Sequence, residues 1–206
     1  MFSIRTCTVA GCRRHAAERS DTCFGHLPDR LAYLAELKTW FESEREFSGL
    51  SLGRQFWKGL DLRGKSFEGS NFMGCRWDEI QLDGASFRHC FFDFGVFKRC
   101  SFKKTSFLFC SVSGSRMEDC DWTGSDLLHV NFNALEALRT QFSESDLYFT
   151  RFVGSKLDQV AFVDCNLKKT QFTGSWLQEV NFKYSNYEEA EFDTAPPPPA
   201  APGIAL

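Results

Sequence analysis

The chain lacks a long hydrophobic run, a secretory leader and a strong excess of charge of either sign. No apolar stretch approaches the roughly 18 residues of a membrane-spanning helix, so we expect no membrane span. The first five residues, MFSIR, lack the apolar core of a signal peptide, and we expect a cytoplasmic protein. With 24 basic and 27 acidic residues, the net charge of −3 argues against a strongly cationic nucleic-acid binder.

Two residue types are over-represented in the 206 residues, a length that suits one domain with a small appendage. There are 23 phenylalanines and nine cysteines. Because nine is odd and no export signal is visible, a complete disulfide framework is not expected. Both excesses therefore need another explanation.

A five-residue repeat explains the phenylalanines. Every fifth position from Phe47 to Phe192 is large and apolar, with Ala137 the one exception. Fifteen of the 23 phenylalanines lie on this frame. Two residues before each large residue, the side chain is small in almost every unit. Two residues after it, glycine recurs. Neither a helix nor a single strand has this period, so we expect a solenoid whose stacked units bury one large and one small side chain each.

The pattern resembles the pentapeptide-repeat family, whose consensus is A(D/N)LXX. Residues 123–127 (TGSDL) and 163–167 (VDCNL) carry the match, which extends over about 47–194. The resemblance implies an all-β solenoid, a right-handed quadrilateral β-helix with 20 residues per coil and about seven coils. The frame has one flaw: Leu135 occupies a small position and Ala137 a large one, so we expect a locally distorted face there.

The cysteines divide into two groups. Six occupy small inward positions of the repeat, where we interpret them as packed free thiols that suit a reducing compartment. Their positions are Cys75, Cys90, Cys100, Cys110, Cys120 and Cys165. The other three precede the repeat in the pattern Cys7-x4-Cys12-x10-Cys23-x2-His26. Three thiolates and an imidazole at this spacing suit a closed, structural zinc site with the look of a zinc knuckle.

Alternatives to this interpretation of the N-terminal segment remain open. The thiols could be unligated, and His15 is a rival fourth ligand. Zinc knuckles often bind nucleic acid, and Arg5, Arg13, Arg14 and Arg19 give this some support. However, residues 1–46 hold seven basic and seven acidic residues, so nucleic-acid binding is less favoured.

The domain organisation follows from these patterns. We expect a Cys/His knuckle at 1–27, a capping helix at 28–46, the β-helix at 47–194 and a Pro-rich disordered tail at 195–206. Asp29 is the expected N-cap of the helix, which would cover the open end of the solenoid. No C-terminal dimerisation helix of the gyrase-inhibitor type is visible, so homo-oligomerisation stays open.

Function must lie on outward positions, and their charges sum to near zero on each of the four faces. Pentapeptide-repeat proteins that mimic DNA and bind type II topoisomerases such as gyrase rely on rows of negative charge. Here no such row is clear, and Lys98, Arg99, Lys103 and Lys104 lie together. Charge therefore makes gyrase modulation by DNA mimicry the second hypothesis.

An outward apolar surface is the stronger signal. At 20-residue spacing, Leu108, Leu128 and Tyr148 align, and Phe109, His129 and Phe149 align beside them, with Phe91 and Phe94 near the adjacent corner. Contiguous exposed apolar residues mark interfaces, although the tail or the helix could instead cover them. We predict a bacterial-type, non-enzymatic scaffold that binds a protein partner here. His89 and His129 look isolated, and no phosphate-binding or dinucleotide motif suggests an enzyme.

Overall fold

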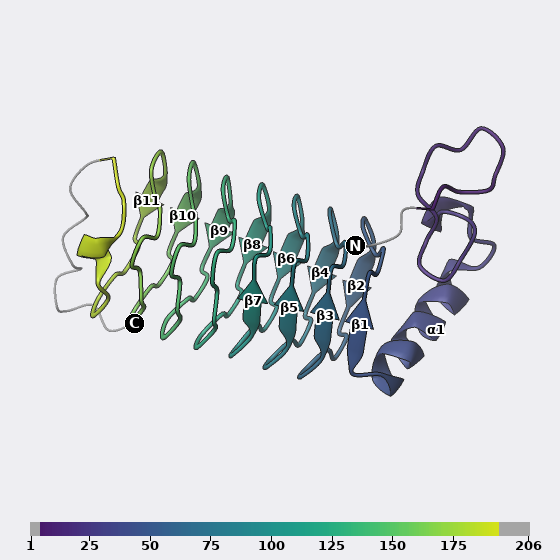
Figure 1. The fold of residues 1–206 in the computed structure, drawn as a ribbon, viewed down its shortest axis with the longest axis horizontal. Coiled ribbons are helices and arrows are strands. Elements are labelled where there is room, and N and C mark those ends of the chain that lie inside the picture. Colours follow the sequence, from purple (N-terminus) through teal and green to yellow (C-terminus); the bar gives the residue numbers. More distant parts are fainter. Residues whose placement is uncertain (1–4, 194–206) are drawn as a thin grey trace.

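The computed structural model describes residues 5–193 (Figure 1). A parallel-strand solenoid of about seven turns forms a rod, preceded by a Cys/His segment with a 3₁₀ turn, η1 (Phe24–His26), and by helix α1 (Arg30–Ser43). The predicted all-β solenoid with an N-terminal Cys/His segment and one helix is confirmed. The Pro-rich tail predicted at 195–206 lies outside the described residues. Within residues 5–193, no helix combines the length and apolarity needed to cross a membrane.

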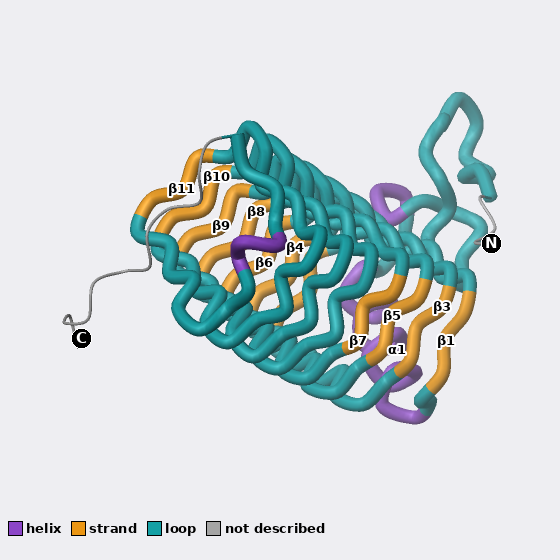
Figure 2. Tube along the Cα trace, turned by 60° about the vertical axis from the view of Figure 1, so that its left-hand side comes forward, coloured by secondary structure: helices purple, strands orange, loops and turns teal. Residues whose placement is uncertain are grey.

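Backbone pairing follows the 20-residue period along four sides of the rod (Figure 2). A four-stranded sheet has the order β1 (Glu46–Ser48), β3 (Ser66–Glu68), β5 (Ser86–Arg88) and β7 (Ser106–Leu108). A seven-stranded sheet begins, from the N-terminal end, with β2 (Phe56–Lys58), β4 (Arg76–Asp78), β6 (Val96–Lys98) and β8 (Arg116–Glu118). It continues with β9 (Glu136–Leu138), β10 (Lys156–Asp158) and β11 (Trp176–Gln178). The other two sides are rows of isolated parallel bridges, and η2 (Tyr187–Glu189) lies in the last coil.

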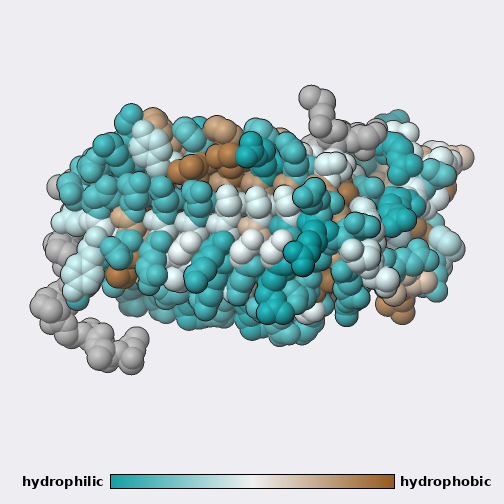
Figure 3. Space-filling view, turned by 60° about the horizontal axis from the view of Figure 1, so that its bottom comes forward, coloured by the Kyte–Doolittle hydropathy of each residue, from teal (hydrophilic) through white to brown (hydrophobic). Residues whose placement is uncertain are grey.

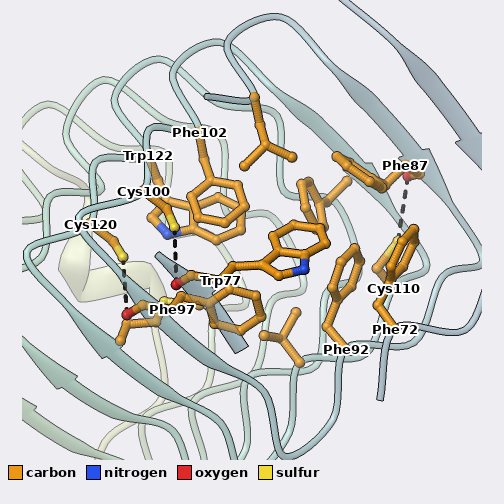
Figure 4. Packing of buried hydrophobic residues seen from close by; sticks show 14 of the residues in the cluster. Phe72, Trp77, Phe87, Phe92, Phe97, Cys100, Phe102, Cys110, Cys120 and Trp122 are labelled. Carbon is orange, nitrogen blue, oxygen red and sulfur yellow. Dashed lines mark hydrogen bonds between the residues drawn. The ribbon is translucent and has the colours of Figure 1, made fainter. Parts of the chain in front are cut away.

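The interior repeats one large and one small side chain per unit, as the sequence predicts. Large rings stack coil upon coil, as in Phe142, Phe162 and Phe182, whose neighbouring centroids lie 5.2 and 5.4 Å apart. The six repeat cysteines are buried free thiols, and five of them donate to a carbonyl 23 residues earlier. Figure 4 shows Cys100 bonded to the Trp77 carbonyl and Cys120 to that of Phe97.

The local distortion predicted at Leu135 and Ala137 is wrong. Strand β9 keeps full parallel register with both β8 and β10, and both side chains are buried. The reason is that the small and large positions of one unit share a common volume. At this unit the large and small side chains are exchanged and both stay buried; the opposite arrangement occurs at Gly95, where the Phe97 ring would lie 2.6 Å from an added Cβ.

Helix α1 covers the N-terminal end of the rod (Figure 1). Asp29 is its N-cap, because its carboxylate accepts from the N–H groups of Leu31 and Ala32 at 2.9 Å. Tyr33, Leu37 and Phe41 form its buried face. The Phe41 ring contacts the rings of Phe47, Trp57 and Phe67, with centroids 5.1–6.2 Å away. The helix stops before the predicted residue 46, since the chain there enters β1.

Candidate metal centre and interaction face

The N-terminal segment brings the four predicted ligands together. Cys7 and Cys12 lie on a turn whose ends are joined by a backbone hydrogen bond between Cys7 and Arg14. The Cys12 N–H donates to the Val9 carbonyl at 3.0 Å and closes this turn. Gly11 supplies the left-handed backbone, φ +75°, that this turn requires. Cys23 and His26 come from the start and the end of the 3₁₀ turn, where the His26 N–H donates to the Cys23 carbonyl.

The ligand atoms have the spacing of a tetrahedral metal site. All four lie within 4.8 Å of one another. The Cys12 and Cys23 sulfurs are 3.8 Å apart, and the His26 Nδ1 lies 3.4 Å from Cys7 Sγ and 3.5 Å from Cys23 Sγ. A tetrahedron with Zn–S bonds of about 2.3 Å has S···S edges of about 3.8 Å, and slightly shorter S···N edges. The cluster could therefore hold one metal ion.

The pKa values of Cys7 and Cys12 are shifted in opposite directions. Burial raises the pKa of Cys7, but hydrogen bonds from the Cys23 backbone and the His26 ring outweigh it and lower the pKa to about 6. Cys12 accepts from the Arg14 backbone, which favours its thiolate. Burial and the neighbouring Cys7 and Cys23 sulfurs outweigh that bond, so the pKa of Cys12 is raised.

The segment is joined to the cap and the first coil. The Glu18 carboxylate accepts from the Ser51 N–H at 2.7 Å, and the Arg19 guanidinium lies 4.8 Å from the centre of the Trp40 ring. Phe24 contacts Tyr33 edge-to-face at 6.1 Å. Folding of the Cys/His segment is thus coupled to the position of α1.

The residues of the alternative interpretations lie elsewhere. His15 is not in the cluster, and its backbone pairs with Thr6. Of the four arginines considered for nucleic acid, Arg5 pairs with Asp21 at 3.3 Å and Arg19 covers Trp40. Half of that basic group is therefore engaged within the chain.

The second candidate site is a stack of rings on an edge of the rod, which we call the stacked row. It consists of His89, Phe109, His129 and Phe149, one residue per coil. Successive ring centroids lie 5.6, 5.0 and 5.0 Å apart with interplanar angles of 6–24°. The Lys169 ammonium continues the row, 4.5 Å from the centre of Phe149.

Backbone bonds between coils fix this row. Each of its residues has a left-handed backbone, φ between 52° and 56°, at a corner of the coil. The Phe109 N–H donates to the Leu128 carbonyl and the His129 N–H to the Tyr148 carbonyl, both at 3.2 Å. The rings therefore project from a rigid scaffold rather than from a loop. From the sequence His89 looks isolated; the 20-residue spacing that links it to Lys169 was the signal that could have revealed the stack.

The other predicted interface residues take several positions. Leu108, Leu128 and Tyr148 lie beside the stacked row and are half-buried; we call them the flanking row. The exposed fraction is 39 % for Phe91, 68 % for Phe94, 52 % for Phe109 and 37 % for Phe149. Phe94 lies apart, with its ring against Gly114 of the next coil. Figure 3 shows a side of the rod where polar residues dominate and apolar residues gather in a narrow band along its length.

Charges on the β4–β9 side are largely paired between coils. Arg99 contacts Asp78 and Glu79, and Lys98 pairs with Glu118 at 2.9 Å. Lys98 and Arg139 together lower the pKa of Glu118. The basic group noted in the sequence also includes Lys103, which pairs with Asp121 at 3.0 Å. This side consequently presents neither a basic patch nor an acidic row.

Comparison with known proteins decides the family. The family profile described as "Pentapeptide repeat region" matches residues 115–192, and "Pentapeptide repeats (8 copies)" matches residues 80–119. Together they span more than half of the chain. The chain belongs to the pentapeptide-repeat family. No curated protein matches it significantly.

Several solved structures are similar to this chain at low sequence identity. A trypsin-treated variant of QnrB1, a plasmid-mediated fluoroquinolone resistance protein, is 16 % identical; the match covers 72 % of this chain and 92 % of QnrB1, with a TM-score of 0.42. HetL, involved in heterocyst differentiation regulation in a Nostoc cyanobacterium, is 13 % identical over 75 % of this chain and 94 % of HetL, with a TM-score of 0.28. A thylakoid-lumen protein of Arabidopsis thaliana is 14 % identical over 66 % and 67 %, with a TM-score of 0.26. Nothing about a partner of this chain follows from values this low.

Proposed function

We propose that this pentapeptide-repeat protein is a non-enzymatic interaction scaffold whose binding surface is formed by the stacked row and the flanking row. The observation that carries the proposal is the ring stack itself. Phe109 and Phe149 keep about half and a third of their surface exposed although the interior of the rod offers apolar burial. Rigid, exposed aromatic groups of this kind are typical anchors of protein interfaces.

We also propose that Cys7, Cys12, Cys23 and His26 bind a structural zinc ion. The matching tetrahedron edges and the closed set of three thiols and one imidazole support this assignment. The metal would hold the Cys/His segment against α1 and so keep the N-terminal end of the rod covered. The six buried repeat thiols suit a reducing compartment, and we keep the cytoplasm as the proposed location.

Modulation of gyrase by DNA mimicry is the weaker proposal. Mimicry needs unpaired rows of carboxylates, and on the β4–β9 side Asp78, Glu118 and Asp119 are paired with lysine or arginine. Nucleic-acid binding by the knuckle is weaker too, because two of its four arginines are engaged within the chain.

The test uses two matched variants. Phe109 and Tyr184 are both exposed aromatic residues with left-handed backbones, φ 53° and 65°, which aspartate tolerates. Proteins captured from the native host by wild type, Phe109→Asp and Tyr184→Asp are compared quantitatively. We expect a specific protein to be retained by wild type and Tyr184→Asp and lost with Phe109→Asp. Equal capture by all three would refute the proposed surface.

A further inference from the structure

The stacked row offers ring edges to a partner, not ring faces. Phe109 lies between His89 and His129, and Phe149 lies between His129 and the Lys169 ammonium. A single-stranded nucleic acid gains its affinity by stacking bases on free aromatic faces, and here those faces are already covered. The exposed edges of the two phenylalanines and the two imidazoles instead form a ridged aromatic strip that suits side chains of a peptide.

The spacing of the ridges selects the conformation of that peptide. Successive ring centroids lie 5.0–5.6 Å apart along the row. An α-helix lying along the rod advances 5.4 Å per turn, so one side chain per turn stays in register with the rings. An extended peptide places same-side residues about 6.6–6.8 Å apart and loses register by about 1 Å or more at each step.

The charge of the strip selects the composition of that helix. Three rows of residues between positions 88 and 171 make up the strip: the stacked row, the positions immediately before it, and the bridged row that begins at Phe91. They contain four basic residues, Arg88, Arg151, Lys168 and Lys169, and no acidic residue. Among residues 5–193, only Lys168 of these four forms an ion pair, with Glu189 at 3.2 Å. Asp126 and Asp146 lie beyond the flanking row, on the opposite border. The strip is therefore aromatic in the middle, with Arg151 on one border, Asp126 and Asp146 on the other, and basic residues at both ends.

We propose that the occupant of this strip is an amphipathic α-helix of a partner protein, about three to four turns long, with one apolar residue per turn and acidic residues beside them. The inference rests on the proposed function, since it names the partner class of the same surface. The apolar side chains would fit between the ring edges, while the acidic ones would meet Arg151 and Lys169. Burial of the apolar face would supply most of the affinity and the charges the orientation.

A peptide selection tests the inference. A display library of random 16-residue peptides is enriched on the full chain after depletion on the Phe109→Asp variant. The enriched peptides are synthesised, and their affinity for wild type, Phe109→Asp, Phe149→Asp and Tyr184→Asp is measured together with their helicity by circular dichroism. Thermal unfolding of each variant checks that it is folded.

We expect apolar residues at i, i+3 or i+4, and i+7, a negative net charge, and helicity that rises on binding. Loss of an anchor aromatic should weaken affinity roughly tenfold or more in both phenylalanine variants, and Tyr184→Asp should leave it unchanged. Phe109-dependent peptides with alternating or basic sequences would overturn the helix while leaving the proposed binding surface intact. Absence of any Phe109-dependent peptide would overturn both. A wild-type dimer that Phe109→Asp dissociates would make a second copy the occupant and also overturn the inference.

Discussion

At the scale of single residues, the small inward position is defined by a hydrogen bond as much as by size. Ser125 donates to the Phe102 carbonyl at 2.7 Å, and Cys110 donates to the Phe87 carbonyl at 3.4 Å, each 23 residues earlier. Serine, threonine and cysteine all occur at this position, because each combines a small side chain with one hydrogen-bond donor. The sequence reveals the size rule, but the bond cannot be predicted, since its acceptor lies in the preceding coil.

This bond gives the first prediction. Ser125→Ala should lower the free energy of unfolding by about 1–3 kcal/mol, because the Thr105 and Phe102 backbone groups lose a buried partner. Ser125→Cys, which keeps a donor, should cost less. Urea denaturation measures both, and an alanine variant as stable as wild type would contradict the role of the hydroxyl.

At the scale of elements, the coil frame is predictable from the sequence and the local exchanges of volume are not. The five-residue period locates every coil because its large residues must face inward. The same rule predicts distortion at Leu135 and Ala137, where the structure instead keeps the register of β9. A rule applied to each position separately cannot reveal that two positions of a unit share one volume.

A double-mutant cycle tests this exchange. Ala137→Leu alone should overpack the interior and cost about 1–3 kcal/mol. Leu135→Ser alone should open a cavity and cost about 2–5 kcal/mol. The double variant restores the common pattern of the repeat, so its loss should be smaller than the sum by at least about 1 kcal/mol. Strict additivity in chemical denaturation would show that the two positions do not share a volume.

The metal centre is the other prediction at this scale. Wild-type protein should contain one zinc ion per chain, and Cys23→Ser should contain much less. Cys110→Ser is the matched control, because it changes a buried thiol of the rod that the metal does not touch. Elemental analysis of purified protein measures the content, and equal zinc in Cys23→Ser and wild type would refute the ligand set.

Loss of the metal should also have a local effect. Amide hydrogen exchange should speed up in the Cys/His segment, α1 and the first coil, which are joined through Glu18 and Ser51. Coils around Phe142 should keep their protection, since each coil of a solenoid depends mainly on its neighbours. Uniform acceleration along the rod would contradict this division.

At the scale of the whole molecule, function depends on which side chains the coils bring into line. The 20-residue period predicts the alignment of Phe109, His129 and Phe149 from the sequence. His89 and Lys169 lie on the same 20-residue spacing, but the apolar pattern does not reveal them, because neither is an apolar residue. The sequence predicts that Cys7, Cys12, Cys23 and His26 come together, since their spacing is local, and the structure groups their side-chain atoms within 4.8 Å of one another.

The proposed binding surface is tested most directly by photo-crosslinking in the native host from positions 109 and 149 of the stacked row, with position 184 as the control. A photoreactive phenylalanine analogue replaces each aromatic residue in turn, and cross-linked proteins are identified by mass spectrometry. If the stacked row binds a partner, positions 109 and 149 should cross-link to the same protein and position 184 should not. No cross-link from 109 and 149, or the same products from all three positions, would contradict it.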